Sequence, residues 1–314
     1  MLTHRSSDHP RPLVRTALPT AVRRALPVLA LGVTSLALTL PTTQAASAAP
    51  RESVSRLTVA AQQAGLEPGN ATMGWRERGP QRSQPAVSRY GRTPAAEARS
   101  SVDDFVPKGI LGIDIASYQR DLDFSLWRGL DRRFVYIKAT EGSSYRNPYF
   151  AGQYAGATDA GLLRGAYHFA SPSGKAGYKQ ARYFVKNGGG WSPDGKTLPG
   201  VLDIEYNPYG KTCYGLSKKK MVAWVSSFTR EYKKLTGKDA AIYTTTDWWK
   251  TCTGNSKKFA TTNPLWIARY GTTKPGTLPK GWKKSTFWQY TSTPIDQDVF
   301  GNKMKRLRVL ATTI

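Results

Sequence analysis

Short apolar runs alternate with amphipathic stretches from residue 109 to the end of the chain. Such alternation is typical of βα units arranged around a parallel sheet, because buried parallel strands are apolar and the helices between them have one apolar face. The pattern predicts strands at 110–118, 133–142, 164–170, 198–206, 240–246, 264–271 and 286–292, with helices near 123–130, 148–162, 175–187 and 216–237.

The predicted helix 216–237 is the longest, and Ser217 and Gly237 are residues that suit a helix start and a helix end. The helices between the later strands are short or missing, so the second half of the domain is closer to all-β. Seven or eight strands in about 206 residues predict a single irregular TIM-like (β/α) barrel of the α/β class, smaller than the usual ~250 residues.

The first 49 residues have a different pattern. A basic head with five arginines precedes an apolar stretch at 25–40, and the small residues at 46–50 offer a cleavage site. The apolar stretch contains Pro27 and is shorter than a bilayer span, which predicts a signal peptide over 1–49 rather than a membrane anchor. No later stretch of the sequence is apolar enough to span a membrane, so we expect a secreted, extracellular protein.

Residues 50–106 are poor in long apolar patterns and rich in Arg, Gly, Pro, Ser and Ala. This composition buries too little apolar surface to offset the entropy lost on ordering. We therefore expect a flexible linker or pro-segment over 50–106, with a short helix at 53–65 as its one candidate element. The folded domain is expected over 107–314.

Cysteine and histidine are scarce. Cys213 and Cys252 are the only cysteines, and in an exported protein a small even number predicts a disulfide. Two of the three histidines fall in the predicted signal peptide, which leaves His168. That scarcity argues against a metal centre and, unless His168 is the base, against a Ser-His-Asp or Cys-His hydrolase. A strand position between Tyr167 and Phe169 favours a hydrogen-bonded structural role for His168, and we expect no metal and no cofactor.

The formal net charge is +25. Such a surface attracts polyanions, and for an exported protein an anionic cell envelope is at least as good a candidate as nucleic acid. Basic runs such as 218–220 are most often the solvated face of a helix, so charge alone does not identify the partner.

Carboxylates stand at the ends of the predicted strands, where barrels of this type place their active sites. Asp203 and Glu205 lie two residues apart at the end of an apolar run, so in a strand they share one face. Repulsion and desolvation should raise the pKa of at least one, as a general acid requires, although ion pairing with Lys or Arg is the alternative. Read in chain order, the strand ends carry Asp114, Glu141, Tyr167, His168, Asp203, Glu205, Arg269, Tyr270, Gln289 and Tyr290, followed by Asp296 and Asp298.

Aromatic residues accompany these carboxylates, namely Tyr118, Tyr145, Tyr167, Tyr206, Trp266, Tyr270, Trp288 and Tyr290. They can form flat walls that stack sugar rings, or they can pack the barrel interior, and we expect at least half to do the latter.

Several motifs resemble one known family. "GIDIASYQ", "YIKATEG", "RGAYHFA", "GVLDIEYNPYG", "PLWIARY" and "FWQYTS" followed by "IDQDVF" are similar to glycoside hydrolase family 25, the Chalaropsis-type lysozymes, over about 110–302 and in family order. The resemblance makes 107–314 the catalytic domain. It implies an irregular β/α barrel and cleavage of the β-1,4 bond between N-acetylmuramic acid and N-acetylglucosamine in peptidoglycan, by a bacterial secreted lysozyme.

The resemblance also implies roles for individual residues. Glu205 matches the general acid that protonates the glycosidic oxygen, and Asp203 matches the carboxylate that assists the substrate's 2-acetamido group, with retention of configuration. Asp114 and Asp296 match supporting acids. Substrate-binding positions are expected at Tyr118, Glu141, Tyr167, Tyr206, Arg269, Tyr270 and Gln289.

Two positions depart from the family pattern. Tyr118 stands where many members have Trp, which alters a sugar subsite, and Asp298 stands where Asn is common, which adds a negative charge near Asp296. Neither departure removes a catalytic group.

Peptidoglycan is the expected partner, with anionic wall polymers as a second one attracted by the basic surface, and a monomer is the default. One alternative is a chitinase-like enzyme, which would need a longer acidic run than "LDIE". A second is a wall-binding protein without activity, which should have lost the carboxylates. A third is a nucleic-acid-binding protein, for which the net charge is the sole evidence.

Overall fold

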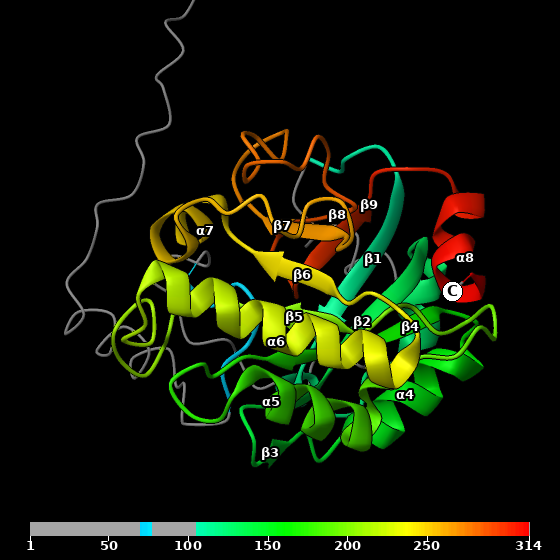
Figure 1. The fold of residues 1–314 in the computed structure, drawn as a ribbon. Coiled ribbons are helices and arrows are strands. Elements are labelled where there is room, and N and C mark those ends of the chain that lie inside the picture. The colour runs from blue at the N-terminus through cyan, green and yellow to red at the C-terminus, as the bar shows by residue number, and fades with distance from the viewer. Residues whose placement is uncertain (1–69, 77–104, 314) are drawn as a thin grey trace, which may run out of the picture. The chain divides into compact units, whose positions relative to one another are not determined.

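A computed structural model describes residues 70–76 and 105–313. In these residues nine strands form one sheet in the order β1-β9-β8-β7-β6-β5-β4-β2-β3, and pairing of β1 with β2 closes eight of them into a barrel (Figure 1). Strand β9 is antiparallel to both of its neighbours and β3 is antiparallel to β2, whereas the other pairings are parallel. The predicted TIM-like α/β barrel is confirmed. The strands are β1 (Ile110–Ile115), β2 (Arg132–Glu141), β3 (Tyr145–Arg146), β4 (Leu163–Phe169), β5 (Val201–Asp203), β6 (Ala241–Thr244), β7 (Leu265–Ala268), β8 (Phe287–Thr291) and β9 (Gln297–Phe300).

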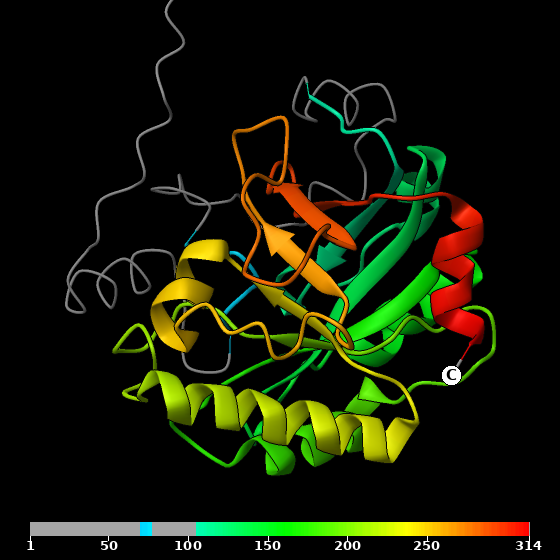
Figure 2. The ribbon, with the colours of Figure 1, turned by 45° about the horizontal axis from the view of Figure 1, so that its top comes forward.

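Helices cover the barrel unevenly. Helices α5 and α6 lie side by side across the strands of the first half, whereas loops and the short α7 connect the later strands (Figures 1 and 2). The prediction of fewer helices in the second half is confirmed. The helices are α3 (Phe124–Gly129), α4 (Phe150–Asp159), α5 (Gly177–Phe184), α6 (Lys218–Thr236), α7 (Thr246–Thr253) and α8 (Met304–Thr312), with a 3-10 turn at Ser117–Gln119 and a π turn at Val185–Gly189.

Local chemistry sets the helix ends. The Ser217 side chain accepts a hydrogen bond from the Lys220 amide at the start of α6, and Gly237 ends that helix in the left-handed conformation with φ 75°. Both are the residues that the sequence predicted. Helix α7 has the same pair of signals, with a Thr245 cap and Gly254 at φ 68°.

Strand side chains alternate between two cores. One set fills the barrel interior, where Tyr136, Tyr243 and Trp266 are fully buried in one cluster. The other set faces the helices, as Leu202 and Ile204 do against α6. Because inward positions at the carboxyl ends of the parallel strands meet at one mouth of the barrel, the alternation decides which side chains reach the site.

Several elements were not predicted. Strand β5 covers only Val201–Asp203 of the predicted 198–206, and β3, β9, α7 and α8 had no counterpart. The four residues of β9 include an inward-facing Asp298, and a buried acid in a short strand gives the pattern of a loop. Helix α7 follows its strand after one residue, so its pattern merges with that of β6.

The predicted signal peptide over 1–49 and the predicted helix at 53–65 lie outside the described residues. Residues 70–76 belong to the stretch expected to be a flexible linker or pro-segment, and Ala71 to Trp75 are buried. No helix in the described ranges is both long and apolar enough to cross a membrane.

Candidate active site

Four acidic side chains from three strands gather at the carboxyl end of the barrel. Asp114 lies near the end of β1, Glu141 ends β2, Asp203 ends β5, and Glu205 follows two residues later. Their exposed fractions are 1%, 4%, 0% and 1%. Buried carboxylates are uncommon unless they are paired or functional, so this concentration marks the barrel mouth as the candidate active site.

Asp203 and Glu205 influence each other electrostatically. Burial raises the pKa of Asp203 well above its usual range, and the neighbouring charge of Glu205 raises it further. Lys138 acts in the opposite direction, since its positive charge favours the ionised form. Two ionised carboxylates are therefore unfavourable at this position, and the pair holds one proton more readily than an isolated carboxyl group would.

A second group of polar side chains surrounds Asp114. The Gln289 amide donates to Asp114 Oδ2 over 2.5 Å, and Gln289 Oε1 accepts from the hydroxyls of Tyr243 and Tyr270, each over 2.6 Å. The backbone amide of Asp114 donates to the carbonyl of Asp296 over 3.2 Å. The structure thus brings together Asp114, Tyr270, Gln289 and Asp296, all predicted from the sequence.

Asp298 lies beside this group on β9. It is fully buried, and its Oδ1 accepts a hydrogen bond from Trp266 Nε1 over 3.0 Å. Burial raises its pKa well above the usual range, and Asp296 adds to the effect. The position that the resemblance marked as a departure therefore places one more acidic group in the barrel interior.

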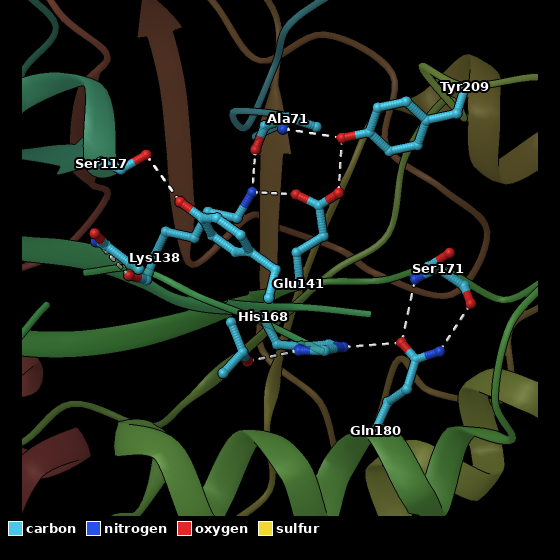
Figure 3. A network of polar contacts seen from close by, with 11 residues as sticks. Ala71, Ser117, Lys138, Glu141, His168, Ser171, Gln180 and Tyr209 are labelled. Carbon is cyan, nitrogen blue, oxygen red and sulfur yellow. Dashed lines mark hydrogen bonds and ion pairs between the residues drawn. The ribbon is translucent and has the colours of Figure 1, made fainter. Parts of the chain in front are cut away.

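A third group contains residues that the sequence did not indicate. Lys138 Nζ donates to Glu141 Oε2, and the Tyr209 hydroxyl donates to Glu141 Oε1 over 2.7 Å (Figure 3). Lys138 is 1% exposed. The available signal was a single Lys in the apolar strand β2, spaced by two from inward-facing Tyr136. Tyr209 carried no local signal, because it lies in a loop that only the fold returns to β2.

The remaining predicted substrate-binding residues are distributed less evenly. Tyr167 is fully buried in the barrel interior, and the Tyr206 hydroxyl donates to Asp247 over 2.8 Å. Tyr118 is half-buried in the turn after β1. Arg269 is exposed, and its guanidinium lies against Gly276 rather than among the groups described above.

Beside Glu141 a pocket of about 430 Å³ opens, and its lining includes Tyr145, Ser171 and Tyr209. It extends the barrel mouth toward the loop after β4.

The His168 side chain points away from the barrel interior, toward helices α5 and α6. Its Nδ1 lies 2.8 Å from Thr140 Oγ1 and its Nε2 lies 2.9 Å from Gln180 Oε1 (Figure 3). Its ring stacks on Phe228 of α6. Burial lowers the pKa of His168 to about 4. The predicted structural role is confirmed, since this imidazole lies between sheet and helices.

The predicted disulfide between Cys213 and Cys252 is present. It joins the loop after β5 to α7 and so braces the segment that follows Glu205. In the part of the chain that the structure describes, no three His, Cys, Asp or Glu side chains are grouped so as to hold a metal ion.

Comparisons with known proteins agree with this geometry. The model of "Glycosyl hydrolases family 25" matches residues 113–299. Lysozyme M1 of Streptomyces globisporus is 45% identical over 211 residues, covering 65% of this chain and 71% of that protein. An N,O-diacetylmuramidase of Chalaropsis sp is 49% identical over 183 residues, covering 57% of this chain and 87% of that protein.

Solved structures show the same likeness. A muramidase from Acremonium alcalophilum has a TM-score of 0.64 and 53% identity, covering 65% of this chain and all of that one. A bacterial lysozyme from Streptomyces coelicolor has a TM-score of 0.64 and 44% identity, covering 65% of this chain and 98% of that one. Because the family model spans more than half of the chain and its range contains the acids at the barrel mouth, this chain belongs to glycosyl hydrolases family 25.

Proposed function

We propose that this protein is a secreted muramidase that hydrolyses the β-1,4 bond between N-acetylmuramic acid and N-acetylglucosamine in peptidoglycan. The observation that carries the proposal is the pair Asp203 and Glu205, both buried at the barrel mouth, with the pKa of Asp203 raised by burial and by its neighbour. The names of the related proteins, lysozyme and N,O-diacetylmuramidase, support the same reaction.

In the proposed reaction Glu205 is the general acid. It transfers its proton to the glycosidic oxygen as the bond to the anomeric carbon breaks, and the carbonyl oxygen of the substrate's 2-acetamido group bonds to that carbon. The resulting carboxylate of Glu205 then takes a proton from water, whose oxygen attacks the anomeric carbon and reopens the ring. Two displacements at one carbon retain its configuration.

Asp203 assists the acetamido group. The bicyclic intermediate carries a positive charge, and the ionised form of Asp203, which the nearby charge of Lys138 favours, stabilises that charge as it develops. The stabilisation therefore arises during bond cleavage rather than on substrate binding, which is the condition for accelerating the reaction. Asp114 and Asp296 are assigned supporting roles, with Tyr118, Glu141, Tyr167, Tyr206, Arg269, Tyr270 and Gln289 as substrate-binding residues.

The proposal includes the cellular setting. Residues 1–49 act as the export signal, and the basic charge concentrates the enzyme on anionic wall polymers, acting as a monomer and without a cofactor. Adsorption to cell walls that is lost above moderate salt is the expected result, and salt-insensitive adsorption would count against this part.

The test is product analysis on purified peptidoglycan. Fragments with reducing N-acetylmuramic acid ends are expected from the wild type, whereas Glu205→Gln should lose nearly all activity while it remains folded by circular dichroism. Glu231→Gln is the matched control, because Glu231 pairs with Arg182 on the outer helices, and it should keep full activity. A wild type that cuts no glycan, or a Glu205→Gln variant as active as the control, would refute the assignment. Proton NMR of the first product distinguishes retention from inversion.

A further inference from the structure

Residues 70–76 occupy the barrel mouth. The segment forms a turn closed by a hydrogen bond from the Trp75 amide to the Thr72 carbonyl over 3.3 Å. Ala71, Met73 and Trp75 are 0%, 0% and 6% exposed, and the segment lies near the ends of β5 and β6 (Figures 1 and 2). Burial of this extent shows that the segment is packed into the domain rather than laid on its surface.

Backbone groups of the segment bind the candidate catalytic residues. The Gly74 amide donates to Glu205 Oε1 over 2.8 Å, across 131 residues of sequence. The Ala71 amide donates to the Tyr209 hydroxyl over 3.1 Å, and Lys138 Nζ donates to the Ala71 carbonyl (Figure 3). An oxygen of the proposed general acid, which would donate a proton to a glycan, here accepts a hydrogen bond from the protein's own chain.

Side chains of the segment fill the adjoining space. Met73 belongs to the apolar cluster of the barrel interior, which also contains Tyr167 and Tyr243. The Trp75 indole Nε1 donates to the Tyr206 carbonyl over 3.1 Å. The Arg76 guanidinium stacks on the Tyr206 ring, 4.1 Å from its centre. A sugar ring stacked on that tyrosine would compete for the same face.

Gly74 fits its position closely. Its φ of +64° is a conformation that side chains disfavour, and a Cβ there would lie 2.2 Å from the Tyr270 hydroxyl and 2.8 Å from Gln289 Oε1. The segment is therefore shaped to the residues proposed to bind substrate, and a larger residue at this position cannot enter the site in the same way.

We propose that residues 70–76 are a built-in inhibitor of the active site, competing with the glycan strand of peptidoglycan. This inference rests on the proposed function. The segment and a glycan cannot both contact Glu205, Tyr206 and Tyr270, so binding of one displaces the other. Covalent attachment keeps the segment at a high effective concentration, and a chain break between residues 76 and 105 would remove that advantage and raise activity.

The test compares Gly74→Val with the wild type in the full secreted chain. The variant should hydrolyse peptidoglycan at least fivefold faster at low substrate concentration, and less so at saturation, because the inhibition is competitive. Gly161→Val is the matched control, since Gly161, between α4 and β4, has φ +72° and a Cβ added there would meet no atom within 4 Å. It imposes the same backbone strain and should leave the rate unchanged.

Hydrogen–deuterium exchange of the peptide containing residues 70–76 provides a readout that does not depend on activity. Protection is expected in the wild type and in Gly161→Val, and its loss in Gly74→Val. An unprotected wild type would overturn the docking. If the wild type is active, and Gly74→Val loses protection but hydrolyses peptidoglycan at the same rate, the inhibition would be overturned. Protection that is lost in Gly74→Val without peptidoglycan cleavage by any variant would refute the proposed function and with it the inhibitory role, leaving only the docked segment.

Discussion

Lys138 is a buried cation at the carboxyl end of β2, and replacing it should cost far more stability than replacing a surface lysine. Its side chain is 1% exposed and that of Glu141 is 4% exposed. Its ammonium group donates to Glu141 and to the Ala71 carbonyl, and lies 5.0 Å from the centre of the Phe169 ring. Lys138→Met keeps much of the side-chain volume and removes the charge.

The size of the effect follows from what the substitution leaves behind. Removing one partner of a buried ion pair strands the other charge, which typically costs about 3–5 kcal/mol. Glu141 keeps the hydrogen bond from the Tyr209 hydroxyl at 2.7 Å, so we expect the lower end, about 3 kcal/mol. The double variant Lys138→Met/Glu141→Gln removes both charges, and its loss should be smaller than the sum of the single losses by at least about 2 kcal/mol.

Urea unfolding at pH 7, followed by tryptophan fluorescence, measures all four members of this cycle. The control cycle uses Lys233→Met and Asp239→Asn, because this pair is 2.7 Å apart but 54% and 28% exposed. Exposed pairs contribute about 0.2–1 kcal/mol. A coupling energy for Lys138 and Glu141 no larger than that of the control pair would refute the idea that burial makes this ion pair strong.

Four further substitutions test burial and packing. Because burial raises the pKa of Asp203 well above 3.8, its ionisation opposes folding at neutral pH; Asp203→Asn should raise the urea midpoint at pH 7 but not below about pH 3.8, and equal gains at both pH values would contradict this. Burial lowers the pKa of His168 from 6.5 to about 4, so the wild type should lose roughly 3 kcal/mol as the pH falls from 6.5 to 4, because the unfolded chain takes up the proton first. His168→Gln should flatten that part of the stability profile, and an unchanged slope would exclude His168 as its source. Gly165→Ala would place a Cβ 2.2 Å from the Tyr136 ring and should cost about 1–3 kcal/mol in thermal melts, whereas Gly152→Ala, with open space around it in α4, should stabilise by up to about 1 kcal/mol.

Features that depend on local periodicity could be predicted from the sequence. Alternation along "VLDIE" places Asp203 and Glu205 on one face and Ile204 on the other, and this is the arrangement around β5. Ser217 and Gly237 bound α6 because capping involves only backbone groups within one helical turn. Such signals need no knowledge of distant residues.

Features that depend on pairing between distant segments could not be predicted from the sequence. The Asp298 position reads as loop until β9 is seen to close the barrel between β8 and β1. Tyr209 reaches Glu141 across 68 residues because a loop folds back over the mouth. Hydrophobic pattern specifies which face of an element is buried, but it does not specify which polar partner that face will meet.

The segment 70–76 shows the limit most clearly. By composition it belongs to a stretch too poor in apolar residues to form a core of its own. Composition therefore predicts only how this stretch behaves in isolation. In the structure, Met73 and Trp75 are buried in cores that the barrel provides, and Gly74 reaches Glu205. The sequence by itself determined most of the strands, the carboxylates at their ends and the family. The tertiary structure decided that a remote segment binds beside Glu205, because burial of that segment depends on a surface that exists only after the barrel has closed.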